Sequence, residues 1–165
     1  MPRTTDPLRE DQAELLAHVD AFRSTADAVG DIPVDELCSM VDARFRFLVE
    51  RLLPHATAED TVLYPAVERV LGPGTTATMR RDHVEVDRLT GELRDLRDRL
   101  AAGGLDDWLA NDLRRVLYGL YAFVRLHVAK EQELYLPVLD SLLPPNEAPA
   151  LFDQMAVVAG QTPSP

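Results

Sequence analysis

The sequence lacks several features that would place it in a class directly. Cys38 is its only cysteine, which excludes an intrachain disulfide and any motif built on paired cysteines. No apolar run approaches the length that spans a bilayer, and residues 1–11 are polar where a secretion signal has an apolar core. We therefore expect a protein of the reducing cytoplasm that does not insert into a membrane.

Basic residues are also fewer than acidic residues. The chain has 17 Lys and Arg against 28 Asp and Glu, which gives a formal net charge of -11. Nucleic acids and anionic membranes attract basic surfaces, so neither is an expected partner. Aromatic residues make up 6% of the 165 residues while hydrophobic residues make up 46%, a profile that favours one globular helical domain.

Apolar residues recur at helical spacing in four long segments. These predict helices over residues 8–29, 34–70 and 75–102, and a fourth from the Asp106-Asp107 cap to Pro144-Pro145. Pro54 lies inside the second and predicts a kink just before His55. Short loops between long amphipathic helices predict an all-α, antiparallel up-down-up-down four-helix bundle. A short extra helix is expected over residues 147–159.

This pattern divides the chain into three parts. We expect a flexible N-terminus over residues 1–7, the bundle over 8–145, and a short helix with a loose C-terminal tail over 146–165.

The strongest signal is a repeated motif, His55-x-x-x-Glu59 and His127-x-x-x-Glu131. Residues i and i+4 lie about 40° apart on a helix, so each copy directs an imidazole and a carboxylate to one side. Each copy is followed by a Leu-Tyr pair and by a proline ten positions after its histidine. Two such copies that face each other across a bundle would form a nitrogen- and oxygen-lined metal pocket.

The other two histidines, His18 and His83, fall on the first and third predicted helices. All four imidazoles are expected on apolar stripes. Core histidines with ordinary hydrogen-bond partners, in a bundle without metal, are the alternative. A metal is favoured because Glu59 and Glu131 also fall on the apolar side, and a buried carboxylate without a partner is costly.

The donor set indicates which metal would bind. Four imidazoles and two carboxylates exceed the needs of one tetrahedral zinc, and calcium and magnesium prefer oxygen ligands. Iron or manganese suits such a set, most naturally as a pair of ions bridged by Glu59 and Glu131. We expect two iron ions, with manganese or zinc less favoured.

These motifs resemble those of the hemerythrin-like family of HHE cation-binding domains, over about residues 8–143. The family pattern of one His, His-x-x-x-Glu, one His and His-x-x-x-Glu is matched by His18, His55 with Glu59, His83, and His127 with Glu131. The resemblance implies a four-helix bundle with a non-heme diiron centre, bridged by carboxylate and by an oxo or hydroxo group.

The chain departs from the oxygen-carrying members on the third helix, where they have His-x-x-x-His and this sequence has His83-x-x-x-Asp87. Asp87 is a candidate ligand, a candidate partner of bound water, or a surface acid. Asp60 follows Glu59 and is expected to point about 100° away from it. Tyr64 and Tyr135 either pack at the bundle end or lie beside the metal as donors or ligands.

We therefore predict a protein that binds or reacts with O2, H2O2 or NO in a redox or iron-stress response. Its carboxylate-rich site favours reactivity or sensing over oxygen transport. An iron- or oxygen-sensing interaction module and a catalase- or peroxidase-like enzyme are the alternatives, so an enzymatic role stays open. The sequence identifies no protein partner.

Overall fold

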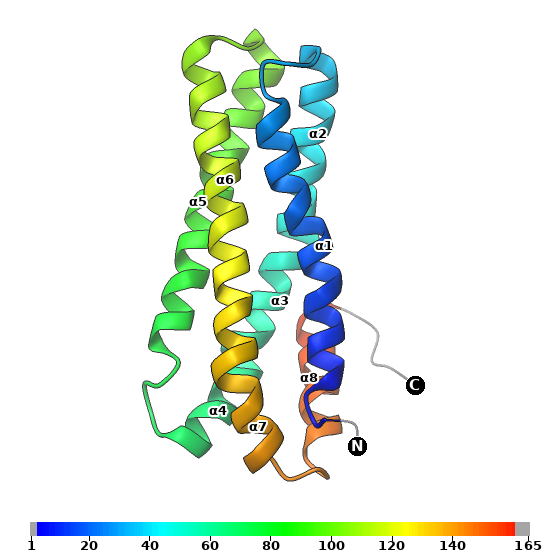
Figure 1. The fold of residues 1–165 in the computed structure, drawn as a ribbon, viewed down its shortest axis with the longest axis vertical. Coiled ribbons are helices and arrows are strands. Elements are labelled where there is room, and N and C mark those ends of the chain that lie inside the picture. Colours follow the sequence, from blue (N-terminus) through cyan, green and yellow to red (C-terminus); the bar gives the residue numbers. More distant parts are fainter. Residues whose placement is uncertain (1–2, 161–165) are drawn as a thin grey trace.

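The computed structural model describes residues 3–160, and these form helices and turns with no strand (Figure 1). Four long helical rods are followed by one short helix. The first rod is α1 (Asp6–Ala28), and the third is α5 (Ala77–Gly103). The second rod is a continuous series of α2 (Val34–Phe47), η1 (Leu48–Leu52), α3 (Leu53–Ala58), η2 (Glu59–Leu63) and α4 (Tyr64–Leu71). The fourth rod is a continuous series of α6 (Asp107–Lys130), η3 (Glu131–Tyr135) and α7 (Leu136–Leu142). The short helix is α8 (Ala148–Val158), and the η segments are π-helical.

The predicted all-helical class is confirmed, and the expected helices agree with the rods to within two residues at each end. The expected extra helix is α8. Residues 161–165 of the expected tail lie outside the described residues. None of the helices in residues 3–160 combines the length and the apolar character that crossing a bilayer requires.

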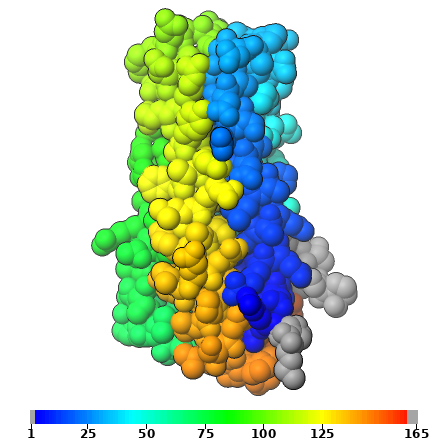
Figure 2. Space-filling view, in the orientation of Figure 1, coloured from blue at the N-terminus to red at the C-terminus, as the bar shows by residue number. Residues whose placement is uncertain are grey.

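The rods pack side by side along most of their length. α1 contacts α2 and α6, and α5 contacts the same two helices. Figure 2 shows α1 and α6 running next to each other along one face of the molecule. α8 packs against α3 and η2, which places it over the second rod where the rod carries His55 and Glu59.

Local signals in the sequence set the ends of the rods. The side chain of Asp106 accepts a hydrogen bond from the backbone N–H of Leu109 at 2.7 Å and so caps α6. Gly104 follows α5 with φ 77°, a conformation that residues with a side chain rarely adopt.

Each proline in the middle of a rod lies just after a π-helical segment. Pro54 follows η1, Pro65 follows η2 and Pro137 follows η3, each at the second position of the next α segment. Proline has no N–H to donate and its ring clashes with the carbonyl four residues earlier, so a wider turn before it relieves the conflict. The sequence predicts a disturbance before His55, where η1 lies; it does not predict η2 or η3.

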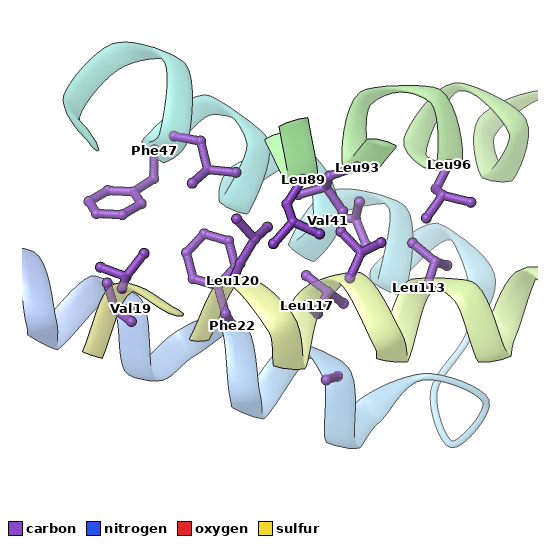
Figure 3. Close-up of a cluster of buried hydrophobic side chains, with 14 of the residues drawn as sticks. Val19, Phe22, Val41, Phe47, Leu89, Leu93, Leu96, Leu113, Leu117 and Leu120 are labelled. Atoms are coloured by element: carbon purple, nitrogen blue, oxygen red, sulfur yellow. The ribbon is translucent and has the colours of Figure 1, made fainter. Parts of the chain in front are cut away.

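The buried side chains form two apolar clusters at different heights along the rods. Figure 3 shows part of the first, where Phe22 and Val41 meet Leu93 and Leu117 from four different helices. The second surrounds the opposite end of the bundle and includes Leu8, Leu63, Met79 and Leu136 with residues of α8. On each rod a polar residue lies between members of the two clusters: Gln12, His55, His83 and Glu131.

The start of the chain is fixed to α7. Thr5 is fully buried, and its backbone N–H and side-chain hydroxyl both donate to Oδ1 of Asp140, at 2.9 and 2.8 Å. Arg9 donates to the other carboxylate oxygen at 3.1 Å. Burial acts to raise the pKa of Asp140, but these hydrogen bonds and the guanidinium charge outweigh it and lower the pKa. Of the segment 1–7 that is expected to be flexible, residues 1 and 2 lie outside the described residues, and Thr5 makes these contacts just before α1.

Asp140→Ala should lower the free energy of unfolding at pH 7 by about 1–2 kcal/mol, because three charge-assisted hydrogen bonds at a partly solvated site are lost. The loss corresponds to a melting temperature lower by roughly 2–8 °C. Because the pKa of Asp140 is lower in the folded state, its carboxylate stabilises the fold fully at pH values above the unfolded-state pKa. This stabilisation is lost as the pH falls through the folded-state pKa. Thermal melts at pH 7 and near pH 3 should therefore show a larger difference at pH 7 than near pH 3. Asp95→Ala, at an exposed acid paired with its neighbour Arg94, is the control and should leave the melt unchanged.

Candidate metal centre

A layer of buried polar side chains lies between the two apolar clusters. His55 and Glu59 come from the second rod, His83 from α5, and His127 and Glu131 from the fourth rod. Their exposed fractions are all 9% or less, and those of Glu59 and Glu131 are 2% and 1%. Charged groups are rarely buried so deeply without a partner of opposite charge.

Glu59 is the centre of the layer. Its Oε1 lies 2.7 Å from Nε2 of His55, and its Oε2 lies 3.1 Å from Nε2 of His83 and 3.6 Å from Nε2 of His127. Within residues 3–160, no hydrogen-bond donor is aligned with Oε1, although the imidazole nitrogen is close. A short contact between an imidazole nitrogen and a carboxylate oxygen that are not aligned for a hydrogen bond is the arrangement expected of two ligands around a shared cation.

The spacing of Glu59, His83 and His127 matches the edges of a coordination shell. The Nε2 atoms of His83 and His127 are 3.0 Å apart, and one ligand atom from each of the three residues lies within 4.8 Å of the others. Metal bonds of about 2.0–2.2 Å place neighbouring ligand atoms roughly 3.0–3.5 Å apart in octahedral or tetrahedral geometry. The three side chains therefore fit a transition-metal ion without rearrangement.

Each imidazole is held from behind by an aspartate. Nδ1 of His55 lies 2.8 Å from Asp11, Nδ1 of His83 lies 3.0 Å from Asp60, and Nδ1 of His127 lies 3.2 Å from Asp82. A carboxylate at Nδ1 favours the tautomer that carries its proton there and leaves the lone pair of Nε2 directed inward. This arrangement is typical of histidines that bind metals.

Glu131 has two neutral donors. Tyr64 donates its hydroxyl proton to Oε1 at 2.7 Å, and the side-chain amide of Gln12 donates to Oε2 at 2.6 Å. Gln132 in turn donates to the carbonyl oxygen of the Gln12 side chain at 3.1 Å. Oε1 also lies 3.7 Å from Nε2 of His127, so the carboxylate borders the imidazole cluster.

The two carboxylates respond differently to burial. Burial acts to raise the pKa of Glu59, but the charge of His55 and hydrogen bonds from the imidazoles hold it well below its ordinary value. Burial, followed by the negative charge of Glu59, raises the pKa of Glu131 to about 8. Burial would also lower the pKa of His55, yet Glu59 and Asp11 raise it well above its usual range. Burial thus opposes the charge on Glu131, while the imidazoles favour the charge on Glu59.

Tyr64 lies inside the layer and Tyr135 does not. The hydroxyl of Tyr64 lies 3.4 Å from Nε2 of His83 and 3.3 Å from Nε2 of His127, whereas Tyr135 donates to the carbonyl of Thr75 at 2.8 Å. Tyr64 stands nine residues after His55, and the residue nine after His127 is Leu136. The two Leu-Tyr pairs are therefore offset by one position and do not correspond.

The π-helical turn explains how Tyr64 reaches the layer. Its backbone N–H donates to the carbonyl of Glu59, five residues earlier. In a straight α-helix a five-residue step turns the side chain about 140° away, and the wider turn of η2 reduces that angle. Tyr64 therefore lies beside the cluster, where it acts as a hydrogen-bond donor, whereas Tyr135 packs at the end of the bundle.

His18 is not part of the layer, so the expectation that it faces inward is wrong. Its side chain is exposed and stacks on Phe47 with ring centroids 5.0 Å apart. The next residue, Val19, takes the inward position, and adjacent residues lie about 100° apart on a helix. The residue that α1 directs at Glu131 is Gln12, so an amide stands where an imidazole was expected.

Asp87 is also outside the layer, since its side chain is exposed while Val86 next to it is buried. Of the three roles weighed for Asp87, the surface acid fits this position. Asp60, expected to point away from Glu59, does so and supports His83 instead.

Gln12, Asp11 and Asp82 are contributors that the sequence analysis missed. Gln12 could have been found from its place on the apolar stripe of α1, between Leu8 and Leu15. Asp11 and Asp82 carry no such signal, because each precedes an inward residue on a helix rich in acids.

A family model described as the hemerythrin HHE cation binding domain matches residues 3–139 of the chain. The match covers every residue of the layer. Comparisons with curated proteins and with solved structures give no significant match.

Asp82→Ala should weaken metal binding by about 10- to 100-fold, because His127 loses the carboxylate that orients it. Asp87→Ala, on the same helix but exposed, is the matched control and should bind metal as the unchanged protein does. Competition with a chromophoric chelator measures both affinities. Equal affinity in the two variants would show that Asp82 does not support a ligand.

His18→Ala should leave the amount of bound metal unchanged, since its ring lies on the surface. Gln12→Ala should reduce occupancy or affinity, because Glu131 loses one of its two donors and its orientation. Metal content after purification under identical conditions separates the two roles. A loss in His18→Ala that exceeds the loss in Gln12→Ala would contradict this assignment.

Proposed function

The chain belongs to the hemerythrin HHE cation-binding domain family, and on that premise we propose that it is a non-heme diiron protein. The proposed scaffold is the antiparallel up-down-up-down four-helix bundle formed by the four rods. The proposed ligands of the centre are O2, H2O2 or NO, with a role in redox or iron stress. No nucleic acid or membrane partner enters this proposal.

The observation that carries the proposal is that the two oxygens of each buried carboxylate point to different groups of side chains. Glu59 directs Oε2 to His83 and His127 and Oε1 to His55. Glu131 directs Oε1 to Tyr64 and Oε2 to Gln12. Two adjoining sets of donors result, with each carboxylate contributing one oxygen to each set. Such sharing favours a pair of ions over a single one.

The donor types favour iron among the transition metals. Imidazole with carboxylate suits iron and manganese, and the layer contains no thiolate of the kind that many structural zinc sites use. The two sets are unequal: one has the imidazoles of His83 and His127 with the phenol of Tyr64, and the other has the imidazole of His55, while Gln12 holds the shared carboxylate of Glu131 through its N–H. Few imidazoles and several oxygen donors support reactivity or sensing over reversible oxygen carriage.

The chain's own residues define what the site can do. Bound iron would supply one-electron chemistry and open coordination positions. The two apolar clusters border the layer on both sides along the rods, and the aspartates hold the imidazoles in place. Tyr64 holds a proton at its hydroxyl, hydrogen-bonded to Oε1 of Glu131, beside two imidazole nitrogens.

A catalase- or peroxidase-like activity is the second candidate, and one observation favours it. Tyr64, Glu131, Gln12 and Gln132 form a continuous chain of hydrogen bonds from the centre toward the partly exposed Gln132. Burial and the negative charges of Glu59 and Glu131 raise the pKa of Tyr64, so its phenol keeps its proton and can donate a hydrogen bond to a peroxide oxygen at the centre, as a general acid does in peroxide turnover. Tyr64→Phe should then slow peroxide consumption while leaving the bound iron in place.

Elemental analysis of protein produced in iron-replete medium tests the main proposal. We expect about two iron atoms per chain, as in a shared-carboxylate pair. Glu59→Gln should reduce the iron content to well under one atom per chain, because the amide replaces one oxygen with an NH2 group that cannot bind a metal and removes the negative charge that both donor sets share. Glu85→Gln, at a surface glutamate of α5 paired with Arg88, is the matched control and should retain the metal. Less than about a tenth of an iron atom per chain in the unchanged protein would refute the proposal.

A further inference from the structure

A groove runs between the first half of α1 and α8, near the lower end of the bundle in Figure 1. Its volume is about 1070 Å³, and its walls come from α1, α8, α3 and the turn before α1. Pockets for organic ligands typically measure roughly 300–1000 Å³. A diatomic molecule needs no space of this size, so the groove is suited to a larger compound.

The groove reaches the candidate metal centre. His55 and Ala58 of α3 form part of its lining, and the other edge of the His55 ring lies 2.7 Å from Glu59. Asp11, which holds Nδ1 of His55, is a lining residue as well. A molecule in the groove therefore lies one side chain away from the buried carboxylates.

The two walls differ in chemistry. The α1 wall carries Asp6, Glu10, Asp11 and Glu14, and Asp153 adds a carboxylate from α8. Arg3 is the one Lys or Arg side chain in the lining, and His55 adds an imidazole that is in contact with Asp11 and Glu59. The rest of the α8 wall is apolar, with Pro149, Phe152, Met155, Ala156 and Ala159. Such a surface repels phosphates and carboxylates and complements a cation with an apolar body.

The acids most available to a ligand are Glu10, Glu14 and Asp153. Among residues 3–160 they form no ion pair, whereas Asp11 is bonded to His55 and Asp6 accepts the backbone N–H of Arg3. Glu10 and Glu14 are four residues apart on α1, so they are separated by about 6 Å along the groove. Ammonium groups joined by three or four methylenes have a similar separation.

We propose that this groove binds a linear aliphatic polyamine, with its ammonium groups along the acids of α1 and its methylenes against the apolar wall of α8. The inference rests on the proposed function in one respect: it places an organic cation beside the diiron centre as a substrate or effector of that site.

Titration calorimetry with spermidine tests the proposal on the full chain, with and without loaded iron. One saturating site is expected, weakened about tenfold or more by the double variant Glu10→Gln and Glu14→Gln. The matched control is Glu36→Gln with Glu50→Gln, which removes the same charge from exposed glutamates of the second rod outside the groove. The acidic chain attracts polyamines everywhere, so equal weakening by the two double variants would overturn the proposal.

A second variant and a second signal complete the test. Ala156→Trp fills the apolar side without changing the charge, and should also abolish the site. In the iron-loaded protein, spermidine should shift the visible absorption of the centre at the concentration that saturates the calorimetric site. Spermidine binding that leaves the visible absorption unchanged would overturn the proposal that the polyamine lies beside the metal centre. Absence of bound iron with intact spermidine binding would instead refute the proposed function and leave the groove as a separate site.

Discussion

The burial of two carboxylates, Glu59 and Glu131, between two apolar clusters is the constraint on which the rest of the structure depends. An isolated charge in such a place is strongly unfavourable, and even a paired one loses much of its solvation. Three imidazoles surround Glu59, while a phenol and an amide bind Glu131. The pKa of Glu131, raised to about 8, shows that neutral donors do not compensate fully for burial. A cation would let Glu131 ionise as well as Glu59, which joins metal binding to the stability of the fold.

The rods are shaped to meet this constraint. Two of the three π-helical segments begin at the buried glutamates themselves, and a proline follows each. The wider turn after Glu59 brings Tyr64 to the layer, while the corresponding turn after Glu131 brings an apolar residue, Leu136. The backbone therefore makes the two sides of the centre different. One side has a proton donor at the cluster, and the opposite side faces the groove beneath α8.

The sequence predicts the helices well because apolar spacing, glycine and proline act locally. The repeated motif predicts both buried carboxylates and two of the imidazoles, because the i, i+4 spacing places them on the same face of a helix. His18 was misplaced because it lies at the margin of its apolar stripe, where a shift of one residue moves a side chain by about 100°. Gln12 was overlooked because an amide carries no metal signal by itself. The position of Tyr64 depends on η2, and the support given by Asp82 depends on a neighbouring helix. Neither relation can be deduced from spacing on one straight helix.

The central claim is that Glu59 and Glu131 are shared between two metal ions. A crystal structure of the iron-loaded protein, with anomalous diffraction collected at the iron absorption edge, tests it most directly. The account predicts two anomalous peaks roughly 3–4 Å apart, each next to one oxygen of Glu59 and one of Glu131. One peak should lie beside His83 and His127 and the other beside His55. A single peak between His83 and His127, or no peak within the layer, would contradict the account.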